Sequence, residues 1–98
     1  MENNTIYTVE TSFGTYRCFL IKNKYENGHV AIQLFGFNGL LATITVNVNG
    51  IERFPKNYSC VDTNNCPWAE EFIRTNGLGE HTGITLKSGW CTYPVYEF

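Results

Sequence analysis

Residues 27–50 read NGHVAIQLFGFNGLLATITVNVNG, and this stretch decides the fold. It contains three Asn-Gly dipeptides eleven residues apart, at 27–28, 38–39 and 49–50. Asn-Gly favours type I′ hairpin turns, because both residues tolerate positive φ. Between the turns the side chains alternate, so that Val30, Ile32 and Leu34 share one face of a strand. The stretch therefore predicts consecutive antiparallel hairpins.

The same period of two continues upstream, over residues 7–10 and 16–21. We therefore predict an antiparallel meander with one apolar face. Cys18 lies on that face and is assigned to packing. Phe19, Ile21 and Phe35 fall on the opposite face, and we expect part of that face to be covered too. His29, beside a turn, is expected to be exposed.

Residues 66–76 predict the only helix. Pro67 suits the first helical position, Glu70 and Glu71 oppose the positive end of the helix dipole, and Asn76-Gly77 forms a C-cap. We expect a loop at 52–58 and two further strands at 82–88 and 92–98. The predicted fold class is α+β, a single domain over residues 1–98 with a mainly antiparallel β-meander sheet and one α-helix packed on it.

Composition excludes several classes of function. The 98 residues carry a net charge of −2. This charge lacks the basic excess with which proteins bind nucleic acid, and it is too weakly negative to imitate a phosphate backbone. The polar N-terminus resembles no signal peptide, and no apolar stretch reaches the roughly 18 residues of a membrane span. We expect a cytoplasmic protein that contacts neither nucleic acid nor membrane. The oligomeric state is not predicted.

Four possible metal ligands lie in the last 39 residues of the chain: Cys60, Cys66, His81 and Cys91. Thiolate and imidazole are the ligands that Zn²⁺ prefers, and three sulfurs with one nitrogen would make a closed structural site. Asp62 could replace Cys60 or His81. The spacings are wider than those of a zinc knuckle, and free cysteines are among the most buried residues. Structural zinc and buried inert thiols therefore stand as alternatives.

A catalytic interpretation is also open. Cys66 precedes Pro67 at the predicted helix N-terminus, where the dipole would lower the pKa of a thiol. His81 and Asp62 would then serve as base and orienting group. The glycines of residues 77–83 follow a helix instead of opening one, which excludes a phosphate-binding loop.

The C-terminal aromatic residues allow two interpretations. They either cover the outer face of the sheet or, if a patch stays exposed, mark a partner site. The residues concerned are Trp90, Tyr93, Tyr96 and Phe98.

Residues 61–79, VDTNNCPWAEEFIRTNGLG, and 91–98, CTYPVYEF, resemble a family of small, mostly uncharacterised proteins. This family is encoded on conjugative elements and prophages of Gram-positive bacteria. The resemblance implies an accessory protein of a mobile element. Some proteins of this setting are anti-CRISPR inhibitors that bind Cas9, and the chain is similar to one that is a metalloprotein. The family pattern covers Cys66 and Cys91 directly.

We therefore expect a non-enzymatic protein that binds and inhibits a host defence protein, the type II CRISPR nuclease Cas9, and carries a structural zinc ion. It would act stoichiometrically on a protein surface through exposed aromatic and acidic groups, with Glu70, Glu71 and Glu80 as candidates. The alternative is a small cysteine-dependent enzyme that uses Cys66.

Overall fold

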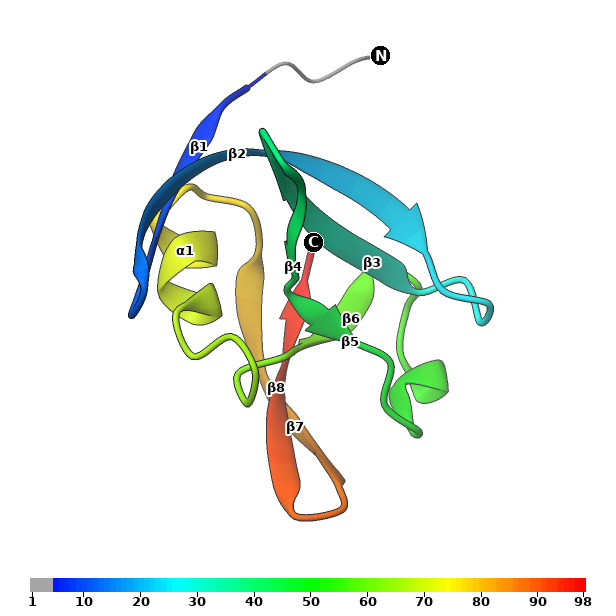
Figure 1. Ribbon diagram of the computed structural model, residues 1–98. Helices are drawn as coiled ribbons and strands as arrows, with labels where there is room; N and C mark the ends of the chain where they lie inside the picture. The colour runs from blue at the N-terminus through cyan, green and yellow to red at the C-terminus, as the bar shows by residue number, and fades with distance from the viewer. Residues whose placement is uncertain (1–4) are drawn as a thin grey trace.

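The computed structural model describes residues 5–98 and contains strands, one α-helix and a short 3₁₀ helix (Figure 1). The strands form two four-stranded antiparallel sheets, in the orders β1-β2-β3-β4 and β5-β6-β8-β7. The α+β fold class is thereby confirmed. The elements are β1 (Tyr7–Thr11), β2 (Gly14–Lys24), β3 (Val30–Gly36), β4 (Gly39–Thr43), β5 (Thr45–Val46), the 3₁₀ helix (Ile51–Arg53), β6 (Tyr58–Val61), α1 (Ala69–Thr75), β7 (Glu80–Ser88) and β8 (Cys91–Glu97).

The first sheet is the predicted meander. Ile32 and Leu34 of β3 are fully buried, as their alternation predicts. The type I′ turns are wrong, because within residues 5–98 no residue other than glycine has positive φ. In each of the first two turns only the glycine has a positive φ, 86° at Gly28 and 110° at Gly39, and the asparagine before it does not. The third Asn-Gly leads into the 3₁₀ helix instead of a hairpin.

The second sheet begins at Ile44, where the strand expected between the second and third Asn-Gly dipeptides is interrupted. The Ile44 N–H bonds to the Ile32 carbonyl at 3.0 Å, whereas its own carbonyl accepts from the Asp62 N–H at 2.8 Å. This residue therefore links the two sheets, and the chain continues as β5 beside β6. Strand β6 was not predicted, since its first residue, Tyr58, fell in an expected loop.

Helix α1 is shorter than the predicted 66–76, since it begins at Ala69. Its predicted C-cap is confirmed: Gly77 has a φ of 62°, and the Leu78 N–H bonds to the Ile73 carbonyl at 3.0 Å. The buried side chains of the helix pack into a cluster with strands of the first sheet, which includes Cys18 as expected. Figure 1 shows α1 beneath the curved β1–β2 hairpin.

A second buried cluster lies between the second sheet and the 3₁₀ helix, and it includes Ile51, Cys60, Tyr93 and Val95. Figure 1 shows the β7–β8 hairpin extending away from the rest of the chain. Among residues 5–98, no helix has the length and apolar character needed to cross a lipid bilayer.

Candidate functional sites

The structure distributes the predicted zinc ligands over different surroundings. Cys66 is buried in the cluster beneath α1, whereas Cys60 is buried in the second cluster, against which the half-buried Cys91 packs. His81 lies at the start of β7, on the surface. Within the described range, no group of three or more His, Cys, Asp or Glu side chains is placed to hold a metal ion. The zinc site therefore stays a prediction without geometric support.

The carboxylate of Asp62, the alternative ligand, is hydrogen-bonded to Asn65. It accepts the Asn65 backbone N–H at 3.2 Å and the Asn65 side-chain amide at 2.9 Å. These bonds form an Asx-type turn that leads the chain toward α1. In this arrangement Asp62 organises the loop.

Cys66 lacks the surroundings of a nucleophile. Burial, and secondarily the Asp62 carboxylate, raise the pKa of its thiol to about 11. The helix begins three residues later, at Ala69, so the thiol lies outside the first helical turn that would lower its pKa. Within residues 5–98, the one hydrogen bond of the Cys66 thiol is to the Thr43 carbonyl, at 3.8 Å. Both features disfavour the cysteine-enzyme alternative.

We expect the alkylation rates of Cys60, Cys66 and Cys91 to follow this geometry. Burial raises the pKa of both Cys60 and Cys66 to about 11, so at pH 8 they are protonated and shielded. In the native protein, Cys91 should react first with iodoacetamide, and Cys60 and Cys66 only upon unfolding. Mass spectrometry of the modified peptides measures the order.

A chelator provides the control for this experiment, because bound zinc would also protect thiols. If burial alone protects Cys60 and Cys66, EDTA leaves their rates unchanged. Faster alkylation in EDTA, together with one equivalent of zinc in elemental analysis of the purified protein, would instead support the zinc site.

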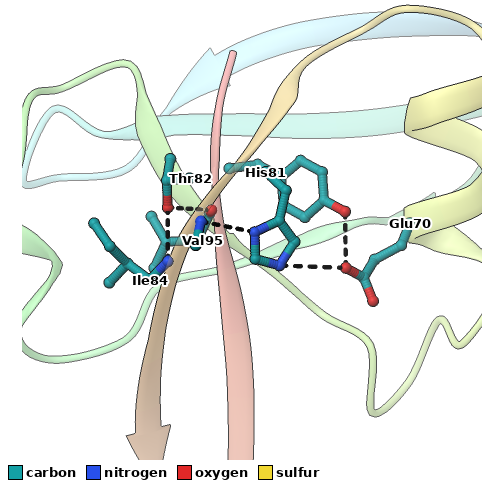
Figure 2. Close-up of polar contacts among 7 residues, drawn as sticks. Glu70, His81, Thr82, Ile84 and Val95 are labelled. Atoms are coloured by element: carbon teal, nitrogen blue, oxygen red, sulfur yellow. Dashed lines mark hydrogen bonds and ion pairs between the residues drawn. The ribbon is translucent and has the colours of Figure 1, made fainter.

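A polar cluster joins α1 to the second sheet, as Figure 2 shows. The Tyr96 hydroxyl of β8 donates to the Glu70 carboxylate of α1 at 2.7 Å, and His81 Nε2 lies 3.9 Å from the same oxygen. The His81 ring packs against the Tyr96 ring with centroids 5.0 Å apart. Burial, and then the bond to Glu70, raise the pKa of Tyr96 to about 12.

The hydrogen bonds of His81 decide what this cluster can do chemically. Its Nδ1 accepts the Gly83 N–H at 2.8 Å, so in the neutral ring the proton is on Nε2, facing Glu70 (Figure 2). The ring then has no free lone pair with which to act as a general base. Beside it, a bulge is held by Thr82, whose hydroxyl donates to the Val95 carbonyl at 2.7 Å. The cluster fastens the helix to the sheet.

The other candidate side chains divide between core and surface. Of the C-terminal aromatics, Tyr93 and Tyr96 are buried, whereas Trp90 at the β7–β8 turn is fully exposed. Glu71 and Glu80 are exposed as expected. Glu80 lies directly opposite Glu97 in the β7–β8 pairing.

The outer face of the first sheet carries an exposed apolar surface, which we call the β2–β4 apolar patch. Its centre is a row across three strands: Phe19 lies opposite Phe35, which lies opposite Leu40. The Phe19 and Phe35 rings stack with centroids 6.0 Å apart. Leu40 is 56% exposed and Phe37 fully exposed. The patch comprises Ile6, Phe19, Ile21, Phe35, Phe37 and Leu40.

A hollow of about 300 Å³ lies in this patch, between Ile6, Phe19, Phe35 and Phe37. Of the residues that the structure describes, Arg17 is the one charged residue that lines it. We expected the outer face around Phe19 to be partly covered. Phe19 is 39% exposed and Ile21 36% exposed, and neither belongs to a buried cluster. Ala31, which its alternation places on the same face, is only 7% exposed, so the face is open around Phe19 and covered at Ala31.

Comparison with known proteins identifies a family without a described activity. The model of the family described as "Domain of unknown function (DUF4313)" matches residues 18–98, which are 81 of the 98 residues. The matched region contains all four predicted zinc ligands and every patch residue except Ile6. No curated protein and no solved structure matches the chain.

Proposed function

The chain belongs to the DUF4313 family, and we propose that it is a non-enzymatic binding protein that docks onto another protein through the β2–β4 apolar patch. The observation that supports this function most is the stacked Phe19–Phe35 row with the fully exposed Phe37 beside it. Contiguous exposed apolar surface is disfavoured in water and marks interaction sites. Aromatic side chains also contribute strongly to binding energy at such sites.

The chemistry of the other candidate sites favours binding over catalysis. The Cys66 thiol is buried with a raised pKa, and the His81 lone pair is engaged by the Gly83 N–H. Neither group offers an activated nucleophile or base. The predicted zinc site is not needed for this function.

The partner follows from the sequence resemblance to proteins of mobile elements. We take it to be a host defence protein in the bacterial cytoplasm, the Cas9 nuclease. A net charge of −2 fits contact with a protein surface better than imitation of DNA. The protein would act stoichiometrically, so inhibition would become complete when the inhibitor equals Cas9 in number.

Titration of Cas9 with the purified chain should abolish DNA cleavage at equimolar amounts. Phe37→Ser and Leu40→Ser should each weaken binding about tenfold or more, since truncation of an interface anchor typically removes more than 1–2 kcal/mol. Isothermal titration calorimetry measures the affinity. Phe13→Ser is the matched control, because Phe13 is also an exposed loop phenylalanine, 88% exposed, but lies outside the patch.

Each result bears on a separate part of the proposal. Full Cas9 activity at a tenfold excess of the chain would contradict the partner. Tight binding that survives Phe37→Ser and Leu40→Ser would contradict the patch. Turnover of Cas9, in which one molecule inactivates many, would contradict a non-enzymatic mode.

A further inference from the structure

A groove separates strand β1 from helix α1, on a different part of the molecule from the centre of the apolar patch. It encloses about 520 Å³, within the range of about 300–1,000 Å³ that is usual for ligand sites. Tyr7, Thr8 and Glu10 line it from β1, and Trp68, Glu71 and Phe72 from the helix side. Figure 1 shows β1 and α1 on the same side of the fold.

The strand that borders the groove is an edge strand. Among residues 5–98, β1 pairs with β2 alone. Thr11 and Gly14 flank the two-residue turn and form a hydrogen-bonded pair, and such pairs alternate with non-hydrogen-bonded pairs along an antiparallel ladder. Tyr7 and Val9 therefore bond to β2. Thr8 and Glu10 direct their backbone N–H and C=O groups to the free edge, where both line the groove.

The walls of the groove define the side chains that would fit it. On the inner side, the Phe72 ring meets the Tyr7 and Trp68 rings edge-on, at 6.1 and 6.3 Å, and forms an apolar floor. Among residues 5–98, the charged residues in the lining are Glu10 and Glu71, both acidic. Glu71 is 79% exposed and 3.9 Å from Arg74, a contact too long and too exposed to neutralise it fully.

We infer that the β1–α1 groove binds an extended segment of a partner protein, which adds to the sheet as a strand beside β1. The unpaired groups of Thr8 and Glu10 supply main-chain hydrogen bonds, the usual source of affinity in strand addition. Side chains of an added strand alternate between two faces. One set would rest on the floor of Trp68 and Phe72, and the other would face Glu10. The ligand is therefore a segment in which apolar and basic residues alternate.

This inference rests on the proposed function in one respect, that the ligand is a segment of a protein. Its test does not use Cas9. Random heptapeptides displayed on phage are selected on the full chain. Enriched peptides should alternate apolar residues with Lys or Arg. A synthetic copy of an enriched peptide should slow hydrogen exchange at the Thr8 and Glu10 amides, measured by NMR, and leave Phe35 and Leu40 unchanged.

Thr8→Pro removes one outward N–H without touching the ladder to β2, and it should weaken the peptide at least about tenfold. Thr8→Val, which keeps the N–H, is the matched control and should bind as the parent does. Because proline could disturb folding, Glu71→Lys provides a second variant: it should weaken basic peptides by a similar factor and lower Tm by only about a few degrees, the effect of a cation in the first turn of α1 beside Arg74. Glu80→Lys, on an exposed residue outside the groove, controls for charge.

Three outcomes would overturn the inference. One is a selection without enriched peptides, and another is a peptide that binds folded Thr8→Pro as tightly as the parent. The third is a parent chain that sediments as a dimer and becomes a monomer upon Thr8→Pro, since a second copy would then occupy the groove. Phe37→Ser should leave peptide binding intact, so failure of the patch and failure of the groove give different results.

Discussion

Phe72→Ala should lower the free energy of unfolding by about 3–5 kcal/mol, the usual effect of removing a buried phenylalanine ring from a core. Phe72 is 4% exposed and lies in α1, where its ring contacts the rings of Tyr7 and Trp68. The helix has only seven residues, too few to be stable alone. Its attachment to the first sheet therefore depends on this side chain. Urea denaturation monitored by circular dichroism measures the change.

Phe13→Ala is the matched control for Phe72→Ala. It removes the same atoms from a side chain that is 88% exposed, and surface substitutions of this kind usually change stability by less than about 0.5 kcal/mol. The contrast separates the packing of the helix from a general effect of losing an aromatic ring. A Phe72→Ala protein within 1 kcal/mol of the parent would show that α1 does not depend on this contact.

The local parts of the fold could be predicted because neighbouring residues determine them. The alternation around Ile32 and Leu34 identifies a strand with one buried face, and both side chains are fully buried. The Gly77 C-cap follows from glycine's tolerance of positive φ. The beginning of α1 was placed three residues early, because Pro67 suits a helix start but the turn at Asp62 still holds the backbone at Cys66.

The division into two sheets could not be predicted in this way. It depends on Ile44, which bonds to Ile32 on one side and Asp62 on the other. These partners are distant in sequence, and the alternation of residues 42–48 continues through the break without any local signal. Strand β6 has the same origin: it exists because β5 and β8 pair with it, not because residues 58–61 have a distinctive pattern.

The candidate sites show the same limit. Phe19, Ile21 and Phe35 were placed correctly on one face by their period, but whether another element covers that face depends on the tertiary fold. The Glu70–Tyr96–His81 cluster joins residues that are up to 26 positions apart, and no spacing indicates it. The zinc site is a prediction that rests on residue type, and elemental analysis still has to test it.

His29 was expected to be exposed because it follows a turn, and this was wrong. Its side chain is fully buried, and Nδ1 lies 2.8 Å from the Tyr58 carbonyl. A carbonyl only accepts, so Nδ1 carries the proton and donates. Within residues 5–98, His29 Nε2 is then a buried acceptor with no hydrogen-bond partner. The ring connects the start of β3 to the start of β6, and thus one sheet to the other.

His29→Ala should lower the free energy of unfolding by about 2–4 kcal/mol, because it leaves both a cavity and an unpaired Tyr58 carbonyl. Thermal and urea denaturation measure the loss. His29→Asn, whose amide nitrogen can occupy the place of Nδ1, should retain more stability than His29→Gln, whose amide matches Nε2. The other histidine is the control: His81 is 43% exposed, so His81→Ala should cost less than about 1 kcal/mol. If both alanine variants were equally stable, the bond from His29 to Tyr58 would not hold the two sheets together.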